Sequence, residues 1–400
     1  MSLTLIVGDI HLGRSVSIGK PGIGSALNSR IQDQMKLLDW VVDQAIENDI
    51  SSVILTGDIC QDPKPDYYLI EIFIEFLKKL EVYNIDVDII AGNHDIKRTG
   101  SHYKSFLDLI TVAELPTVHI HKYVNTIIRE GVGFTLLPFR DRRSLGCKTD
   151  KEAFARISTL LTYELEAISN SSDRVLIGHL ALEGSMFVGD EFDNEVNELM
   201  CPLDMFSGYD YVWMGHVHKP QVRSKTPYMA HVGSLDISDF GETDHQKIIV
   251  LYDTENPNKF REIVVPSRPL CRLQIDVPEG FTATNYVADQ IKALHKKNPL
   301  TNAIVKVEIK LLDYDAENID RGVIEKVIYD LGAYYICNLS ESRNVSVVPI
   351  VSQHDIDNKI DTKVAVKVWS EHDEFKDDQE KSDYIDLANQ FVEAYEEKYC

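Results

Sequence analysis

Five times along this 400-residue chain, a short apolar run stops beside a glycine, and aspartate, asparagine or histidine follows at once. The five stretches contain Gly8-Asp9, Gly57-Asp58, Gly92-Asn93-His94, Gly178-His179 and Gly215-His216. A short apolar run bounded by turn residues is typical of a buried strand, and glycine lets the backbone turn sharply where the strand ends. The pattern therefore predicts buried strands that each deliver polar side chains to a loop.

Helical periodicity separates the first three runs. After the runs at 3–7, 53–56 and 87–91, apolar residues recur at helical spacing in 30–48, 67–80 and 102–113. Residues 14–29 are rich in glycine and serine, which predicts a long loop beside Asp9 and His11. Strand, loop and helix repeated three times predict right-handed crossovers and a largely parallel sheet, with the loops side by side at its carboxyl edge.

From residue 118 the pattern changes to short strands. We expect strands at 118–121, 125–129, 134–137, 174–178, 211–214, 228–232, 247–252 and 259–265, and a helix at 152–168. These segments predict a second, mixed sheet. The expected fold class is therefore α/β, with two sheets packed face to face as a sandwich and helices outside.

A boundary is expected near Pro266 and Pro269, because 400 residues exceed what one core usually organises. We expect a main domain over 1–267 and a small α+β domain over 268–351, followed by a charged linker over 352–382 and an amphipathic helix over 383–400. The small domain would contain strands at 271–276, 303–311 and 345–350 and helices at 286–295 and 319–331. The apolar stripe of the last helix either packs on the chain's own body or docks on a partner, and the acidic residues before it favour a partner.

The net charge of −23 limits the partners. A protein that binds nucleic acid unaided is usually basic over the contact face, so tight unaided binding to DNA or to an anionic membrane is disfavoured. No run approaches eighteen apolar residues, which disfavours a membrane span. The six cysteines are scattered without a CxxC pair, which favours a reducing, cytoplasmic setting.

The residues at the strand ends form a metal-ligand set. They are Asp9, His11, Asp58, Asn93, His179, His216 and His218. Any one of them could belong to a turn or be a satisfied core histidine, but five such strand ends in order indicate a metal site. Mixed oxygen and nitrogen donors without thiolate suit manganese, iron or zinc, and the number of donors favours two divalent ions. Asp58 is the natural bridge, because a carboxylate can offer one oxygen to each ion.

This ligand set predicts phosphoester hydrolysis. Two divalent ions about 3.5–4 Å apart can activate water and neutralise phosphate oxygens during in-line displacement. His94 need not be a ligand. Beside Asn93 it could donate a proton to the leaving oxygen or stabilise the developing charge.

At this point the chain resembles a known family. Its motifs Asp9-x-His11, Gly57-Asp58, Gly92-Asn93-His94-Asp95, Gly178-His179 and Gly215-His216-x-His218 are similar, in order and spacing, to the five signatures of calcineurin-like metallophosphoesterases. The resemblance implies that His94 is the catalytic histidine. It also implies one metal on Asp9, His11, Asp58 and His218, and another on Asp58, Asn93, His179 and His216.

Within that superfamily the chain looks most like the SbcD-type nucleases, whose eukaryotic relatives are the meiotic-recombination-eleven proteins. The similar segments are Asp62-Pro63-x-Pro65, Leu137-Pro138-Phe139 and 231–242. The resemblance implies exonuclease action on duplex DNA ends and endonuclease action on single-stranded or hairpin DNA, with manganese preferred and magnesium, iron or zinc as alternatives. It also implies a capping domain, a homodimer, and a C-terminal helix that docks on an SbcC-type, SMC-like ATPase. The alternatives are a metallophosphoesterase that acts on cyclic nucleotides, nucleotides or phosphoproteins, and an inactive scaffold.

Several residues near the ligand loops are candidates for binding substrate. They are Gln61, Lys97, Arg98, Arg140 and Lys219. Each basic residue either steers a phosphate backbone or belongs to a solvated loop. At Gln61 some members of the family carry a histidine, so the resemblance supplies no second catalytic histidine here.

Three further residues have expected structural roles. His119 and His121 alternate on a strand without glycine, which predicts a surface or pairing role. Asp95 is expected to support its loop or a neighbouring histidine.

Overall fold

The computed structural model describes residues 3–24, 26–99, 102–188, 199–256, 258–312, 318–343, 379, 381–382, 384–388 and 390. At 97–99 and 102–103 the description covers the backbone alone.

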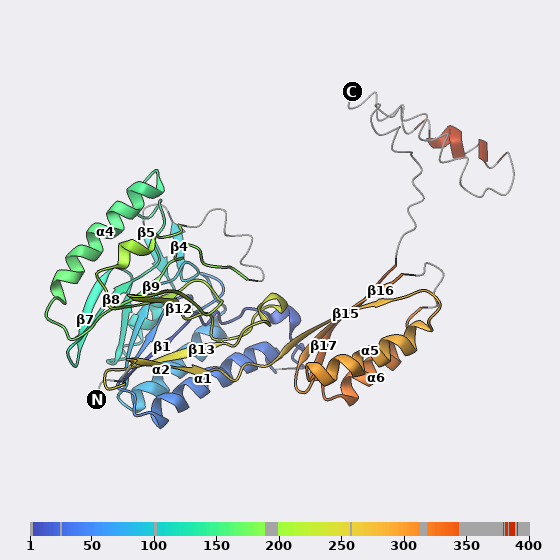
Figure 1. Ribbon diagram of the computed structural model, residues 1–400, viewed down its shortest axis with the longest axis horizontal. Coiled ribbons are helices and arrows are strands. Elements are labelled where there is room, and N and C mark those ends of the chain that lie inside the picture. The colour runs from blue at the N-terminus through green and yellow to red at the C-terminus, as the bar shows by residue number, and fades with distance from the viewer. Residues whose placement is uncertain are drawn as a thin grey trace.

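Two six-stranded sheets pack face to face (Figure 1). The first has the spatial order β14 (Phe260–Val264), β13 (Ile248–Asp253), β1 (Leu3–Val7), β2 (Ser52–Leu55), β3 (Asp86–Ile90) and β6 (Val118–His121). Strands β1, β2, β3 and β6 are parallel, β13 is antiparallel to β1, and β14 is antiparallel to β13. The parallel part matches the expected crossovers.

The second sheet is also mixed. Its order is β11 (Gln221–Lys225), β12 (Tyr228–His231), β10 (Tyr211–Gly215), β9 (Arg174–His179), β8 (Val132–Leu137) and β7 (Asn125–Arg129). Its four central strands are parallel, and its two outer strands are antiparallel to their neighbours. Residues Ile54, Ile90, Phe134, Ile177 and Trp213 belong to the buried layer between the two sheets.

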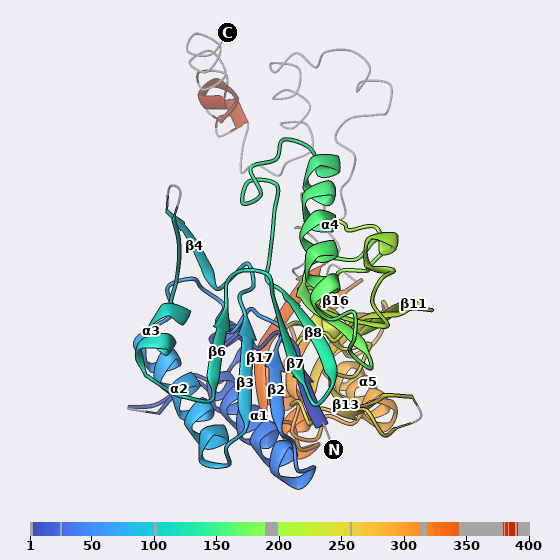
Figure 2. The same cartoon turned by 90° about the vertical axis from the view of Figure 1, so that its left-hand side faces the viewer.

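Helices cover the outer faces. On the first sheet lie α1 (Ser29–Glu47), α2 (Tyr67–Val82) and the short α3 (Leu107–Val112), and on the second lies α4 (Asp150–Ala167). Single 3-10 turns are η1 (Val16–Ile18), η3 (Leu203–Phe206) and η4 (Phe240–Glu242). A hairpin, β4 (Ile96–Thr99) and β5 (His102–Ser105), rises with α4 on one side of the sandwich (Figure 2). The predicted α/β sandwich flanked by helices is confirmed.

A smaller unit follows (Figure 1). Its parallel sheet is β15 (Leu270–Val277), β16 (Ile304–Leu311) and β17 (Tyr335–Arg343), and one face is covered by α5 (Ala283–Lys297) and α6 (Arg321–Asp330). This unit has its own buried core, with Val287, Ile291, Val307 and Ile324 among its members. A separate core is consistent with the proposed boundary near residue 268.

Four expectations about the elements were wrong. Residues 102–113 do not form one helix, because 102–105 pair with β4 as a strand. Strand β6 pairs with β3, β13 pairs with β1 and β14 pairs with β13, so all three belong to the first sheet rather than the second. Strands β4, β11 and β17 were not predicted. The sheet assignments failed because an apolar or alternating pattern identifies a strand but not the strand it pairs with. Strand β13, for example, is buried on both faces, so its sequence does not indicate which sheet it joins.

The expected strand at 345–350 lies outside the described residues. Of the expected terminal helix, the described residues 384–388 and 390 are helical, as are 379, 381 and 382, which we expected in the linker. Among the described residues, no helix is long and apolar enough to cross a membrane.

Candidate metal centre

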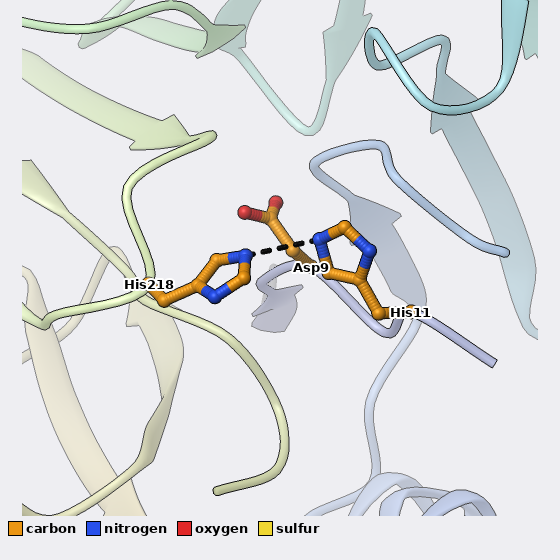
Figure 3. A group of neighbouring side chains, drawn as sticks. All are labelled: Asp9, His11 and His218. Atoms are coloured by element: carbon orange, nitrogen blue, oxygen red, sulfur yellow. Dashed lines mark hydrogen bonds between the residues drawn. The ribbon is translucent and has the colours of Figure 1, made fainter. Parts of the chain in front are cut away.

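The strand ends that carry the predicted ligands meet at one edge of the sandwich. Ligand atoms of three groups lie within 4.8 Å of one another: Asp9, His11 and His218; His11, Asp58 and His94; and Asp58, His179 and His216. Figure 3 shows that the first group comes from two distant parts of the chain, with Asp9 and His11 facing His218. Asn93 joins the third group through its side-chain oxygen. All seven predicted ligand residues are thus neighbours, and their roles as ligands remain a prediction.

Asp58 lies between the groups. Its Oδ2 is 3.5 Å from His11 Nε2 on one side and 3.2 Å from His179 Nε2 on the other. Its Oδ1 accepts a hydrogen bond of 2.8 Å from the main-chain N–H of His94. Burial alone would raise the pKa of Asp58, but His179 and His11 hold it well below its ordinary value. An ionised carboxylate at this position suits a bridging role.

Asn93, His179 and His216 form one side of the centre. His179 Nδ1 lies 2.8 Å from the main-chain oxygen of Thr56 and must donate to it, because a carbonyl only accepts. Its Nε2 lies 2.9 Å from Asn93 Oδ1. His216 Nδ1 lies 3.0 Å from the same amide oxygen. Three candidate ligand atoms therefore converge: Asn93 Oδ1, His179 Nε2 and His216 Nδ1.

Asp9, His11 and His218 form the other side. Nε2 of His218 and Nε2 of His11 are 3.0 Å apart (Figure 3). Burial lowers the pKa of His11 well below its ordinary value, and burial lowers that of His218 to about 3. Both rings are therefore neutral, which is the form that binds a metal. Burial also raises the pKa of Asp9 to about 6.

This donor set fits divalent cations. Carboxylate and amide oxygens lie close to imidazole nitrogens there, so positive charge stabilises the cluster. Burial alone would lower the pKa of His179, but Asp58 and Asp9 raise it to about 10, so a proton supplies this charge at neutral pH and a bound cation would replace it. The described donors at the centre include no cysteine, so manganese, magnesium, iron or zinc would suit it better than a thiolate-bound metal.

Backbone strain gathers at the centre. Three candidate ligands that are not glycine have left-handed φ angles: His11 at 48°, Asp58 at 49° and His216 at 80°. Such conformations cost about 1–3 kcal/mol each and often mark functional sites. Glycine is needed at Gly92, because a Cβ there would lie 2.1 Å from Asp58 Oδ1.

His94 is held from two sides. Its Nδ1 donates to the main-chain oxygen of Gln61 at 2.6 Å, and its ring meets that of His11 edge to face, with centroids 4.9 Å apart. The Gln61 bond leaves Nε2 as the atom that can face a substrate. Gln61 thus acts through its backbone, while its side-chain Oε1 is buried without a hydrogen-bond partner among the described residues.

Asp95 supports its loop, as expected. Its Oδ1 accepts from the main-chain N–H of Ile59 (2.8 Å) and its Oδ2 accepts from that of Gly92 (2.9 Å). The carboxyl group therefore ties the Asp58 loop to the Asn93 loop. Burial, together with the charge of Asp58, raises the pKa of Asp95 to about 7.

The predicted substrate-binding residues are dispersed. Arg140 donates to the main-chain oxygens of Phe139 (2.7 Å) and Lys122 (2.8 Å). Lys219 pairs with Asp244 at 2.9 Å. Lys97 and Arg98 lie on β4, and their side chains are outside the description.

Two histidines outside the motifs have structural roles. His121 Nε2 bonds to Asp88 at 2.8 Å, which confirms a pairing role. His231 is buried and spends both ring nitrogens within the protein: Nδ1 donates to Gly215 O, and Nε2 accepts from Ser185 Oγ at 2.9 Å.

Five residues around the centre were not predicted. Glu242 is fully buried, with a carboxylate oxygen 3.2 Å from His218 Nδ1, and Lys247 pairs with Glu242 at 2.8 Å. Arg14 Nη1 lies 2.9 Å from the same nitrogen of His218 and 3.0 Å from its Nε2. The ring centroids of Phe139 and Phe187 lie 5.8 and 6.3 Å from that of His216. The sequence pointed to these positions only through the resemblance of segments 137–139 and 231–242 to the family. That resemblance assigned no role to individual residues.

Comparisons with known proteins agree with this architecture. A model of the family described as calcineurin-like phosphoesterase matches residues 3–220. The chain is 25% identical over 307 residues to "DNA double-strand break repair protein Mre11" of Aeropyrum pernix, which covers 72% of this chain and 66% of that protein. It is also 25% identical over 287 residues to a protein of Staphylococcus epidermidis that is named as a component of the nuclease SbcCD. That alignment covers 69% of this chain and 74% of the other protein.

The chain thus spans just under two thirds of the length of the first of these relatives. Among solved structures, a dimetal phosphatase from Danio rerio aligns over 66% of this chain and 98% of its own, with 11% identity and a TM-score of 0.38. A similarity at that level carries no structural argument.

Proposed function

This chain belongs to the calcineurin-like phosphoesterase family, and from that premise we propose that it is a two-metal phosphodiesterase that cleaves DNA. The observation that carries the proposal is the position of Asp58, whose Oδ2 lies within 3.5 Å of His11 on one side and of His179 on the other. An ionised carboxylate between two groups of candidate ligands is what a bridge between two cations requires.

We assign the ligands in two sets. Asp9, His11, Asp58 and His218 would hold one ion, and Asp58, Asn93, His179 and His216 would hold the other. When bound, the two ions would activate water and neutralise the charge that develops on the phosphate oxygens.

The chain's own groups prepare the rest of the reaction. The Gln61 carbonyl fixes the tautomer of His94, so that Nε2 would meet the leaving oxygen. Glu242 and Arg14 position the ring of His218, because a Glu242 carboxylate oxygen lies 3.2 Å and Arg14 Nη1 lies 2.9 Å from its Nδ1. Phe139 and Phe187 pack beside His216 and would exclude water from that side.

DNA is proposed as the substrate because of the relatives. Two proteins that align with about 70% of this chain are named as part of a nuclease and as a DNA double-strand break repair protein. We propose exonuclease action on duplex ends and endonuclease action on unpaired DNA. We further propose that an SMC-like ATPase partner, bound through residues 383–400, supplies much of the DNA affinity, because the chain carries a net charge of −23.

The test uses the full chain and Asp58→Asn with labelled duplex, single-stranded and hairpin DNA in manganese or magnesium. We expect cleavage by the wild type in manganese, none in EDTA, and a loss of at least a hundredfold in Asp58→Asn, because an amide cannot offer an anionic oxygen to both ions. As a control, Asp39→Asn changes a carboxylate that is 55% exposed on α1 and should cleave normally.

The outcomes separate the competing functions. Cleavage of a nucleotide or phosphopeptide without cleavage of DNA, with or without the ATPase, would replace DNA as the substrate. Absence of bound metal in the wild type would indicate a scaffold rather than an enzyme.

A further inference from the structure

A cavity of about 300 Å³ lies between α4 and the base of the β4–β5 hairpin. Its apolar wall includes Val124, Leu145 and Leu160, and its polar wall includes Lys122, Arg140 and Arg156. This volume is at the lower end of the range for pockets that bind small molecules. Figure 2 shows α4 and β4 on the same side of the two sheets.

The charge of the cavity is opposite to that of the chain. Its lining has three cationic side chains, of which Lys122 pairs with Asp108, and one carboxylate, that of Glu164, in a protein with a net charge of −23. Arg156 is exposed and has no hydrogen-bond or ion-pair partner among the described residues. Hydrogen bonds to the main-chain oxygens of Phe139 and Lys122 orient Arg140. These features favour an anionic ligand.

An exposed aromatic ring completes the lining. Tyr123 is 74% exposed and lines the cavity together with the cations. Proteins that bind single-stranded nucleic acid combine aromatic rings, on which bases stack, with basic groups that contact the phosphates. A base within a duplex is already stacked on both faces, so the ring favours an unpaired nucleotide.

Two residues of the cavity lining adjoin residues around the metal centre. Ser105 lines the cavity and donates through Oγ to the main-chain oxygen of Asp95 at 2.6 Å. Arg140 directly follows Phe139, whose ring centroid is 5.8 Å from that of His216. A nucleotide in the cavity would therefore be close to one whose phosphate lies at the metal centre.

We propose that this cavity binds one unpaired nucleotide of a DNA strand whose neighbouring phosphate lies at the metal centre. The inference rests on the proposed function and names the form of DNA that the site accepts. Arg156, Leu160 and Glu164 are spaced by four residues on α4 and so share one face. The phosphate lies at the Arg156 end, away from the Glu164 carboxylate, and the base lies against Tyr123 and Leu160.

The test measures binding without cleavage. A fluorescein-labelled oligothymidylate of about twelve nucleotides is titrated with the full chain in EDTA, and its fluorescence anisotropy is followed at several salt concentrations. Tyr123→Ala should weaken binding roughly tenfold, because it removes a stacking surface. Arg156→Glu should weaken binding by a similar factor and reduce the slope of log K against log salt by about 0.7, the value for one lost phosphate contact on a single strand.

Matched variants exclude a general effect of charge or surface. Tyr163 is 72% exposed on the same helix and does not line the cavity, so Tyr163→Ala should bind within twofold of the wild type. Lys151→Glu makes a comparable charge reversal on α4, five residues before Arg156 and about 140° around the helix, and should also bind normally. Tyr123→Phe keeps the ring and should restore binding, while circular dichroism checks the fold of every variant.

Absence of binding by the wild type, or equal binding by all the variants, would overturn the proposal. Tight binding of free thymidine monophosphate in the cavity, together with variants whose affinity for the oligonucleotide equals that of the wild type, would also overturn it. The cavity would then serve a free nucleotide. The measurement needs no hydrolysis. Its failure is therefore distinct from a failure of the proposed nuclease activity, which is measured separately with Asp58→Asn.

Discussion

Single main-chain amides hold the loops of the metal centre against one another. His94 N–H donates to Asp58, and His216 N–H donates to Asp9, each at 2.8 Å. Asp95 accepts two more amides, from Ile59 and Gly92. Each carboxylate thus fixes a loop other than its own. This arrangement offsets the cost of the left-handed backbone at three candidate ligands.

The role of Asp95 predicts a loss of stability in Asp95→Asn. An asparagine has one acceptor oxygen, so one of the two amides would face an NH2 group and remain unsatisfied. The free energy of unfolding should fall by about 1–3 kcal/mol. Urea denaturation in EDTA near pH 4, well below the raised pKa of about 7 of Asp95, measures the change where the cost of burying its charge is small. Asp39→Asn, on the surface of α1, should change the stability by less than about 0.5 kcal/mol. Equal stability of Asp95→Asn and the wild type would refute the bracing role.

At the scale of elements, an ionic cluster ties the two sheets together. Asp88 on β3 accepts from His121 on β6 and from Arg129 on β7. Arg129 also pairs with Asp86. Strands β3 and β7 belong to different sheets, so the cluster closes one side of the sandwich. Burial alone would raise the pKa of Asp88, but hydrogen bonds from His121 and Arg129 lower it below its ordinary value.

The lowered pKa of Asp88 predicts how stability depends on pH. The carboxylate stabilises the fold fully above its unfolded pKa of about 3.9, and this contribution is lost as the pH falls through the lower folded pKa. Asp88→Asn should therefore reduce the free energy of unfolding by roughly 2 kcal/mol at pH 7. The difference from the wild type should shrink below about pH 4. Urea titrations between pH 3 and 7 measure it, and a difference that grows toward pH 3 would contradict the prediction.

At the scale of the whole molecule, one arginine joins the small unit to the sandwich. Arg268 donates through Nε and Nη2 to both oxygens of Asp33, each at 2.7 Å, and through Nη1 to the main-chain oxygen of Asn302 at 3.0 Å. Its guanidinium lies 3.9 Å from the ring centre of Tyr334. Asp33 also accepts from Arg30, so the junction continues into α1. The two units therefore contact one another through a buried network of charges.

This network predicts energetic coupling across the junction. In a double-mutant cycle with Arg268→Ala and Asp33→Ala, the interaction energy should be about 1–3 kcal/mol, because the two side chains are only 8% and 7% exposed. The exposed pair Arg142 and Asp150 serves as the control and should give less than about 1 kcal/mol. Calorimetry measures both cycles, and additive effects at Arg268 and Asp33 would show that the junction is not coupled.

The sequence was sufficient to predict the parallel core strands and the residues that meet at their ends. These features are local: an apolar run, a glycine and a polar side chain are adjacent in the chain, and parallel strands bring their carboxyl ends together. The metal ions and the role of each ligand remain predictions.

Tertiary structure alone decided the features that depend on distant segments. The apolar run of β13 marked a strand but could not say that it pairs with β1, about 240 residues earlier. Glu242 reaches His218, Asp95 joins two loops, and Arg140 and Arg156 line one cavity, although nothing in the spacing of these residues links them. Such contacts arise only when separate elements pack together, because a side chain's partners are set by its neighbours in space rather than in sequence.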